Sequence, residues 1–148
     1  IAISKADQAM SMVPESQKSD CAILVEDSGL FIDSLEGFPG TYSSFVFRKI
    51  GVDGILRLMN GNKMKGCEYR AVSVLVIGER KIIAKGVCRG KISEKISGTG
   101  GFGYDPIFIP DDSDGRSFAQ MSREEKSSIS HRGKSLKALS EAISSPSM

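Results

Sequence analysis

The residues in this chain best suited to chemistry begin with a loop at 98–105, called the glycine loop here. Four of its first six residues are glycine, and Phe102, Tyr104 and Asp105 lie among and after them. Each glycine costs about 0.5–1 kcal/mol of extra chain entropy relative to alanine, so this density predicts a backbone that approaches something closely. Aromatic faces beside an acid suit the stacking and edge pairing of a flat heterocyclic base.

Cationic side chains follow the glycine loop within about thirty residues, at Lys126, His131 and Arg132. Ser122 and Glu125 match the S-x-x-E capping box, which predicts a helix start there. A second helix start beside His131 offers free amide donors and the positive end of a helix dipole. Together these groups are suited to anchoring an electron-rich ligand such as a nucleotide.

Less specific interpretations of the same residues stay open. Lys126 also fits a solvated lysine on a helix, and a lone His131-Arg132 pair also fits a surface feature. The spacing Gly98-x-Gly100-x-x-Gly103 resembles a dinucleotide fingerprint, but that fingerprint requires a helix immediately afterwards, where this sequence predicts a strand. The sequence contains no GxxxxGK[ST] pattern, which excludes a P-loop protein.

Asp27 is the candidate catalytic acid. The apolar run Cys21–Val25 predicts a strand buried on both faces, and Asp27 is expected to end it. Ser28 and Gly29 would then let the backbone turn toward a ligand. Because an acidic pair at the edge of a buried strand is costly, Glu26 and Asp27 require a cationic partner. The alternative is a turn-forming aspartate that caps a local amide.

The composition of the chain limits which classes of protein it can belong to. The chain has 148 residues, 40% hydrophobic and 26% charged, which predicts one globular domain spanning residues 1–148. A net charge of +2 is too mild to favour a nucleic-acid partner. No apolar run is long enough to predict a membrane partner, and three cysteines without metal-ligand spacing predict free thiols in a reducing cytoplasm. Because no initiator methionine is present, we expect a chain that starts inside a longer protein.

The sequence patterns predict a single α/β unit with a mixed sheet. The expected elements are a helix at 1–12, a strand from 21 to 25, helices at 41–50 and 52–60, a hairpin of 68–78 with 81–89, short strands at 91–96 and 106–110, helices from 122 and from 130, and a frayed tail at 144–148.

Five segments in order carry a resemblance to a known family. They are Val25-Glu26-Asp27-Ser28-Gly29-Leu30, Gly37-Phe38-Pro39-Gly40-x-Tyr42-Ser43, Gly98-x-Gly100-Gly101-Phe102-Gly103-Tyr104-Asp105-Pro106-Ile107-Phe108, Met121-Ser122-x-Glu124-Glu125-Lys126 and Ile129-Ser130-His131-Arg132-Gly133. The chain resembles the inosine triphosphate pyrophosphatase family, also called dITP/XTP pyrophosphatases, and its archaeal branch most closely.

That resemblance implies an elongated α/β fold with a long mixed sheet, two lobes around a central cleft, and a homodimer. It places the nucleotide site on Asp27, Ser28, Phe102, Gly103, Tyr104, Asp105, Lys126, His131 and Arg132. Asp27 would be the catalytic carboxylate and a Mg²⁺ ligand, with Ser28 beside the substrate. Phe102 would stack on the purine, and Asp105 would accept a hydrogen bond from its Watson–Crick edge.

The hypothesis is hydrolysis of ITP, dITP or XTP to the monophosphate and pyrophosphate. It requires the carboxyl group of Asp27, the ring of Phe102 and the guanidinium of Arg132 to face one common crevice. The family's Gly-Asn loop, with a Lys that holds the triphosphate, has no counterpart in this sequence, and the family's upstream acidic metal ligand would fall just before Ile1. A truncated chain with impaired metal and triphosphate binding is therefore expected. Two alternatives remain: a catalytically impaired nucleotide-binding fragment, and a related housecleaning pyrophosphatase with a different base preference.

Overall fold

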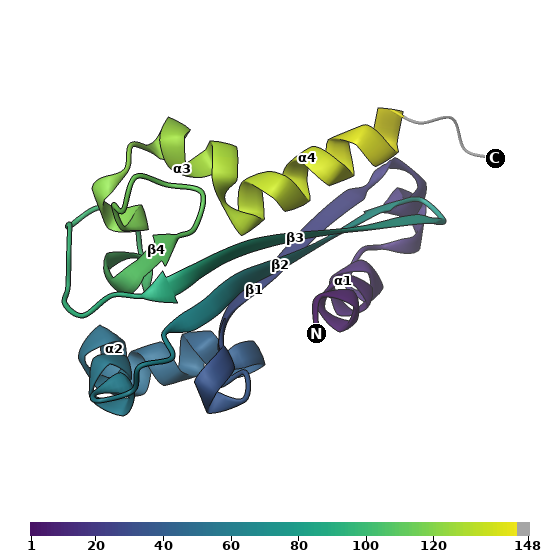
Figure 1. Ribbon diagram of the computed structural model, residues 1–148. Coiled ribbons are helices and arrows are strands. Elements are labelled where there is room, and N and C mark those ends of the chain that lie inside the picture. The colour runs from purple at the N-terminus through teal and green to yellow at the C-terminus, as the bar shows by residue number, and fades with distance from the viewer. Residues whose placement is uncertain (145–148) are drawn as a thin grey trace.

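The fold is built on one long sheet, shown in Figure 1. The computed structural model describes residues 1–144, apart from the side chains of residues 18–20. The strands lie in the order β1-β2-β3-β4, and they are β1 (Ala22–Ile32), β2 (Gly66–Ile77), β3 (Arg80–Ile92) and β4 (Phe108–Pro110). The elongated α/β architecture is confirmed. The expected mixed sheet is wrong for these strands, because the chain reverses direction at each connection and all three pairings are antiparallel.

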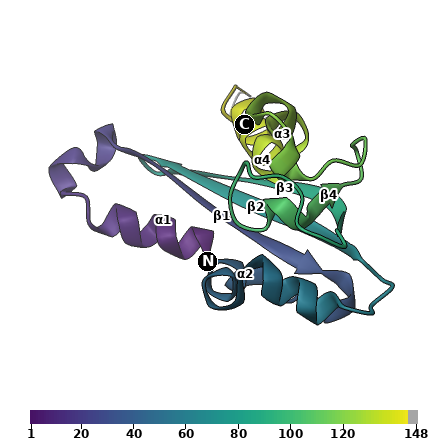
Figure 2. The same cartoon turned by 90° about the vertical axis from the view of Figure 1, so that its left-hand side faces the viewer.

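Helices cover both faces of the sheet. They are α1 (Ala2–Ser11), α2 (Ser43–Met59), α3 (Arg123–Ile129) and α4 (His131–Ser144), with 3₁₀ turns at Glu15–Asp20, Asp33–Leu35, Gly40–Tyr42, Asp105–Ile107 and Phe118–Gln120. Figures 1 and 2 show α1 and α4 on opposite faces, with α2 at the end of the sheet where β1 finishes. Apart from Ser144, which ends α4, the predicted frayed tail lies outside the described residues.

The prediction that strand β1 ends at Asp27 is wrong. The strand pairs with β2 over its whole length, from Ala22 opposite Ile77 onward. Gly29 is therefore not a turn residue. A Cβ atom at this position would lie 2.4 Å from the carbonyl oxygen of Gly40, so glycine is needed for close approach of two backbone segments. Nor is β1 covered on both faces, since Leu24 is 54% exposed.

Local turn signals were predicted well. Gly51 interrupts α2 with φ 63° and ψ −167°, which confirms two helical segments at this point. Gly78, with φ 58°, turns the β2–β3 hairpin as expected. The predicted strand at 91–96 is wrong beyond Ile92. The chain turns there because the Ser93 amide donates to the carbonyl of Ile107 at 2.8 Å and its hydroxyl donates to the carbonyl of Lys95 at 2.6 Å.

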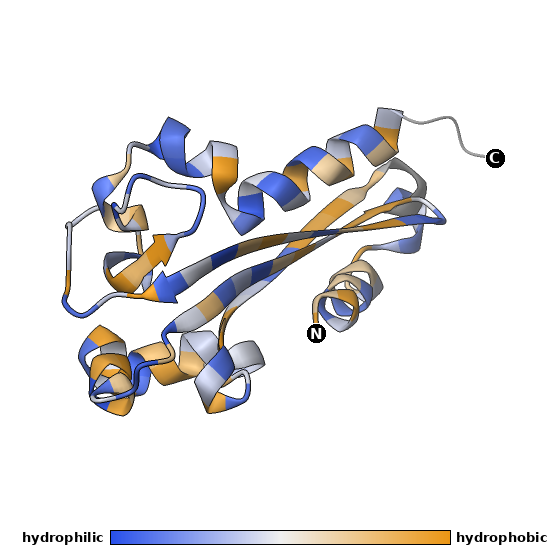
Figure 3. Cartoon of the chain, viewed as in Figure 1, coloured by the Kyte–Doolittle hydropathy of each residue, from blue (hydrophilic) through white to orange (hydrophobic). Residues whose placement is uncertain are grey.

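The main core fixes α2, the sheet and the glycine loop relative to one another. Figure 3 shows hydrophobic residues along the strands and in α2. The buried members of this cluster are Leu30, Ile32, Val46, Ile55, Met59, Cys67, Tyr69, Cys88, Ile92, Tyr104, Ile107, Phe108 and Phe118. All three cysteines are free thiols. No helix within residues 1–144 has the length and apolar character to cross a membrane.

Candidate active site

Two cavities meet at the β1 edge of the sheet, and Ser28 and Gly29 line both of them. The first, called the loop cavity, has a volume of about 390 Å³ and lies between the start of α2, the glycine loop and the start of α4. The second, called the α1 cavity, has a volume of about 470 Å³ and lies against the first turn of α1. A ligand that crosses β1 at this point contacts both.

Most of the predicted site residues line the loop cavity. They are Ser28, Phe102, Gly103, Tyr104, Asp105, His131 and Arg132. Lys126 does not line this cavity, but its ammonium nitrogen lies 2.5 Å from the Asp105 carboxylate and 4.4 Å from the centre of the Phe102 ring. Asp27 is the exception, because it lines the α1 cavity instead.

The common crevice expected for Asp27, Phe102 and Arg132 is divided by the edge of β1 into two adjoining cavities, and the three residues do not line a single one. Consecutive residues of a strand point to opposite faces of its sheet. Asp27 points toward α1, where its Oδ1 lies 3.1 Å from the Nζ of Lys5. Phe102 and Arg132 lie in the loop cavity on the other side. The two cavities adjoin at the edge of β1, where Ser28 and Gly29 line both.

The glycine loop approaches the protein's own backbone and side chains. Gly98, Gly101 and Gly103 have φ values of 91°, 67° and 60°, a region that other L-residues rarely adopt. A Cβ at Gly101 would also lie 2.1 Å from Oδ2 of Asp105. The close approach predicted from the glycine density is thus largely internal, and it lets the loop wrap around a buried carboxylate.

Asp105 is an anchor for three separate segments. Only 2% of this residue is exposed. Its Oδ2 accepts from the amide of Phe102 at 3.0 Å and from Lys126, while its Oδ1 accepts from the hydroxyl of Tyr69 at 3.4 Å. Burial, followed by the charge of Asp105, raises the pKa of Tyr69 well above its usual value. These contacts tie the glycine loop to β2 and α3.

Phe102 presents a flat face beside two cations. Its side chain lies at the surface, with 58% of the residue exposed. The guanidinium carbon of Arg132 lies 4.7 Å from the ring centroid, close to the Lys126 contact described above. An exposed ring next to fixed positive charge suits stacking with an electron-rich base.

His131 is buried and is not the surface feature that the sequence allowed. Its ring stacks on Tyr69 with centroids 4.4 Å apart and planes 11° apart. Burial, followed by the charges of Arg132 and Lys126, lowers the pKa of His131 to about 3. The imidazole is therefore neutral near pH 7. Its Nδ1 is the single buried side-chain nitrogen or oxygen within the described residues that lacks a hydrogen-bond partner.

The start of α4 is seated directly on the sheet. A Cβ atom at Gly86 of β3 would lie 2.1 Å from the carbonyl oxygen of His131, so only glycine allows this contact. Further along the helix, the hydroxyls of Ser73 and Ser135 lie 2.5 Å apart. This close docking fixes His131 and Arg132 at the edge of the loop cavity.

Sequence reasoning missed the contacts of two residues that build the site. Ser43 links β1 to the glycine loop. Its hydroxyl accepts a hydrogen bond from the amide of Leu30 at 2.8 Å, and its carbonyl accepts one from the hydroxyl of Tyr104 at 2.7 Å. Glu26 accepts from Nε of Arg132, a contact between residues 106 positions apart. The cationic partner that the sequence required for Glu26 is thus present, but local sequence does not indicate that it is Arg132.

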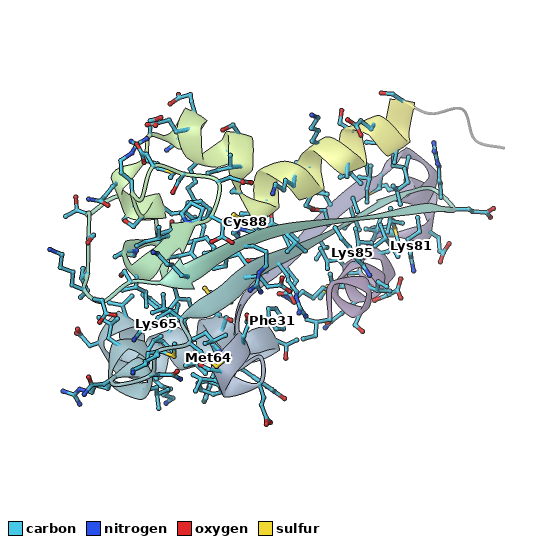
Figure 4. The ribbon with its side chains drawn as sticks, viewed as in Figure 1. Phe31, Met64, Lys65, Lys81, Lys85 and Cys88 are labelled. Atoms are coloured by element: carbon cyan, nitrogen blue, oxygen red, sulfur yellow. The ribbon has the colours of Figure 1, made fainter. Side chains whose placement is uncertain are left out.

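The α1 cavity contains cations as well as Asp27. Asp27 pairs with Val72 of β2, and Val72 pairs with Lys85 of β3, so the three residues lie side by side on one face of the sheet. All three line this cavity. Figure 4 shows Lys81 and Lys85 below the sheet beside α1, whereas Cys88 lies above it. Over the described part of the chain, no cluster of three or more His, Cys, Asp or Glu side chains could hold a metal ion.

Comparison with known proteins identifies the family. Residues 1–142 match the family model described as the Ham1 family. The chain belongs to the Ham1 family. This Ham1-family chain is 52% identical to the dITP/XTP pyrophosphatase of Pyrococcus horikoshii, an alignment that covers 80% of this chain and 63% of that protein. It is 46% identical to the dITP/XTP pyrophosphatase of Thermococcus kodakarensis, over 82% of this chain and 65% of that protein.

Solved structures agree with this assignment. The Ham1 protein of Staphylococcus aureus superposes with a TM-score of 0.82 and 26% identity, over 96% of this chain and 73% of that chain. A HAM1 protein from Coxiella burnetii superposes with a TM-score of 0.82 and 30% identity, over 96% and 74%. The family predicted from the five motifs is confirmed. This Ham1-family chain spans less than two thirds of the length of the curated relatives named above.

Proposed function

We propose that this Ham1-family chain carries the nucleotide site of an enzyme that hydrolyses non-canonical purine nucleoside triphosphates, ITP, dITP and XTP, to the monophosphate and pyrophosphate. The observation that supports it most is the meeting of two unlike cavities at Ser28 and Gly29. The loop cavity presents an aromatic face and the cation of Arg132, and the α1 cavity presents the carboxylate of Asp27 with lysines. A base joined to a chain of phosphates needs these two environments side by side.

The loop cavity receives the base in this proposal. The purine stacks on Phe102, and the terminal nitrogens of Arg132 donate to the 6-oxo group of hypoxanthine or xanthine. Adenine carries an amino group at that position, which would leave the donors of Arg132 unpaired at about 1–3 kcal/mol for each lost hydrogen bond. Base selectivity therefore follows from the donor character of the cavity.

The phosphates cross the edge of β1 and enter the α1 cavity. Asp27 holds its carboxylate there with 28% of the side chain exposed, within reach of a water molecule. Water attacks the α-phosphorus, the bond from that phosphorus to the α–β bridging oxygen breaks, and pyrophosphate leaves. Asp27 accepts the proton of the attacking water, while Lys5 and Lys85 place positive charge beside the phosphate oxygens.

Asp27 also fits Mg²⁺ as a single protein ligand. Mg²⁺ is commonly held by one or two carboxylates together with substrate phosphates and water, so a preformed cluster of ligands is not required. The partly exposed carboxylate of Asp27 meets this condition. When bound, the ion supplies neutralisation of charge on the phosphate oxygens.

The proposal includes a homodimer located in the cytoplasm. Support for self-association comes from aromatic side chains at and near the start of α2, where Tyr42 is 71% and Phe45 is 52% exposed. The free thiols agree with a reducing compartment. Sedimentation equilibrium of the protein tests the dimer, and a Phe45→Ser variant that shifts the mass toward the monomer would locate the interface.

A substrate panel tests the reaction. Pyrophosphate release is measured from ITP, dITP, XTP, ATP and a pyrimidine triphosphate, with phosphate release as the control for a different bond cleavage. We expect the three non-canonical purines to be turned over at least about tenfold faster than ATP, as one lost donor pairing predicts. Binding of ITP without pyrophosphate release would instead support the impaired fragment, and preference for the pyrimidine would support the related housecleaning enzyme.

A further inference from the structure

Glu26 lies on the opposite face of β1 from Asp27. Its register partner on β2 is Ser73, whose hydroxyl contacts Ser135 of α4. This places Glu26 beneath the first turns of α4, on the loop-cavity side. The two neighbouring acids, which the sequence presents as a pair, therefore act in different surroundings.

Glu26 forms a hydrogen bond with Arg132, the side chain that is proposed to recognise the base. Its Oε1 accepts from Nε of Arg132, and 24% of the Glu26 side chain is exposed against 40% for Arg132. Arg132 also lies over the ring of Phe102. Among the residues of 1–144 whose side chains the structure describes, none forms a hydrogen bond with a terminal nitrogen of Arg132, and both nitrogens stay available to a ligand.

An arginine side chain has several rotatable bonds, and free rotation would spread its donors over many positions. A carboxylate that engages Nε leaves the planar outer edge of the guanidinium in a defined orientation. The Phe102 ring restrains the same group from its face. With one partner at Nε and one at the plane, the terminal nitrogens are presented in a fixed direction.

We propose that Glu26 is a positioning residue for base selectivity: it orients Arg132 so that the terminal nitrogens meet the 6-oxo group of the purine. This inference rests on the proposed function and goes beyond it, because Glu26 contacts Arg132 and does not itself line the loop cavity. It also distinguishes Glu26 from Asp27, which faces the phosphates. Loss of Glu26 should therefore affect recognition of the base rather than the hydrolytic step.

The test compares two substrates in Glu26→Ala. Inosine triphosphate has the 6-oxo group, and purine riboside triphosphate lacks any 6-substituent. We expect kcat/KM for inosine triphosphate to fall about tenfold, mainly through KM, and kcat/KM for purine riboside triphosphate to stay within about twofold. Glu26→Gln retains an acceptor for Nε and should recover part of the loss. Asp33→Ala, which removes another carboxylate partner of an arginine, at 2.7 Å from Arg89, is the matched control and should not alter the substrate ratio.

A double-mutant cycle gives the second measurement. In an Arg132→Ala background, Glu26→Ala should cause no further loss with inosine triphosphate, because its effect acts through that arginine. Equal losses on both substrates, a changed Mg²⁺ dependence, or additive effects in the cycle would each overturn the inference while leaving the proposed function intact. If the wild-type protein neither bound nor hydrolysed inosine triphosphate, the proposed function would fail and this inference with it.

Discussion

The two sides of β1 differ in how completely the protein builds them. On the loop-cavity side, Tyr104, Asp105 and His131 are 3%, 2% and 4% exposed, and hydrogen bonds or ring contacts hold each one. On the α1 side, Asp27 and Lys5 keep 28% and 51% of their side chains exposed and are held by one ion pair with each other. The loop-cavity side is thus held by several buried contacts, and the α1 side by a partly exposed ion pair.

This difference matches the chemistry proposed for each side. Selection of a neutral base requires donors in fixed positions, because a misplaced donor discriminates poorly. A triphosphate carries several negative charges, and these attract mobile lysines over a longer range. Substitutions on the two sides should therefore have different consequences. On the loop-cavity side they should change affinity and stability, and on the α1 side they should change turnover.

The largest effect is expected from Asp27→Asn. Removal of the proton acceptor should lower kcat by at least about 10³-fold, within the range for general-base residues, with unchanged thermal stability and retained inosine nucleotide binding. Steady-state kinetics and calorimetric titration measure these quantities. Asp7→Asn, which breaks a 2.7 Å contact from α1 to Lys81, is the control for general disturbance of this face. Retained hydrolysis of ITP by Asp27→Asn would refute the catalytic assignment.

Asp105→Asn should mainly reduce stability. Lys126 would keep its charge in a site where only 15% of its side chain is exposed, with its partner neutralised. Removing one member of a buried pair costs about 3–5 kcal/mol. Urea denaturation measures the change in unfolding free energy, and Glu124→Gln in the same helix is the exposed control. A loss below about 1 kcal/mol would show that Asp105 is not an anchor.

Acid should destabilise the loop-cavity side through His131. The unfolded state binds a proton below pH 6.5, whereas the folded state resists it until about pH 3. Stability is therefore fully present above pH 6.5 and falls as the pH drops toward 3, by up to about 1.4 kcal/mol per pH unit. Since the chain contains one histidine, an NMR titration reports this group alone. His131→Gln should flatten the slope, and an observed pKa near 6.5 would contradict the burial argument.

The smallest effect is expected from Phe102→Ala. Loss of the stacking surface should raise KM for ITP about tenfold, in line with 1–3 kcal/mol per stacked base, while stability changes little because the ring is exposed. Leu58→Ala is the control, since that apolar residue is also exposed, at 49%, and lines neither cavity. Equal KM changes in both variants would exclude a base platform at Phe102.

Features set by neighbours in the chain were predictable. The capping box of Ser122 and Glu125 starts α3 as expected, and the breaks at Gly51 and Gly78 occur where the sequence places them. These depend on dihedral preferences and on hydrogen bonds spanning a few residues. The strand ending at Asp27 was mispredicted for the opposite reason. Its continuation depends on pairing with β2, which begins more than thirty residues further along the chain.

By itself, the sequence determined which residues are candidates for the site and which family the chain belongs to, because motifs are recognised from residue types and their order without knowledge of contacts. Only the tertiary structure decided how they are divided. Strand alternation sends Asp27 to one face of β1 and Glu26 to the other, and the docking of α4 brings Arg132 to Glu26. A pairing across 106 residues depends on the positions of whole elements, and no local preference encodes it.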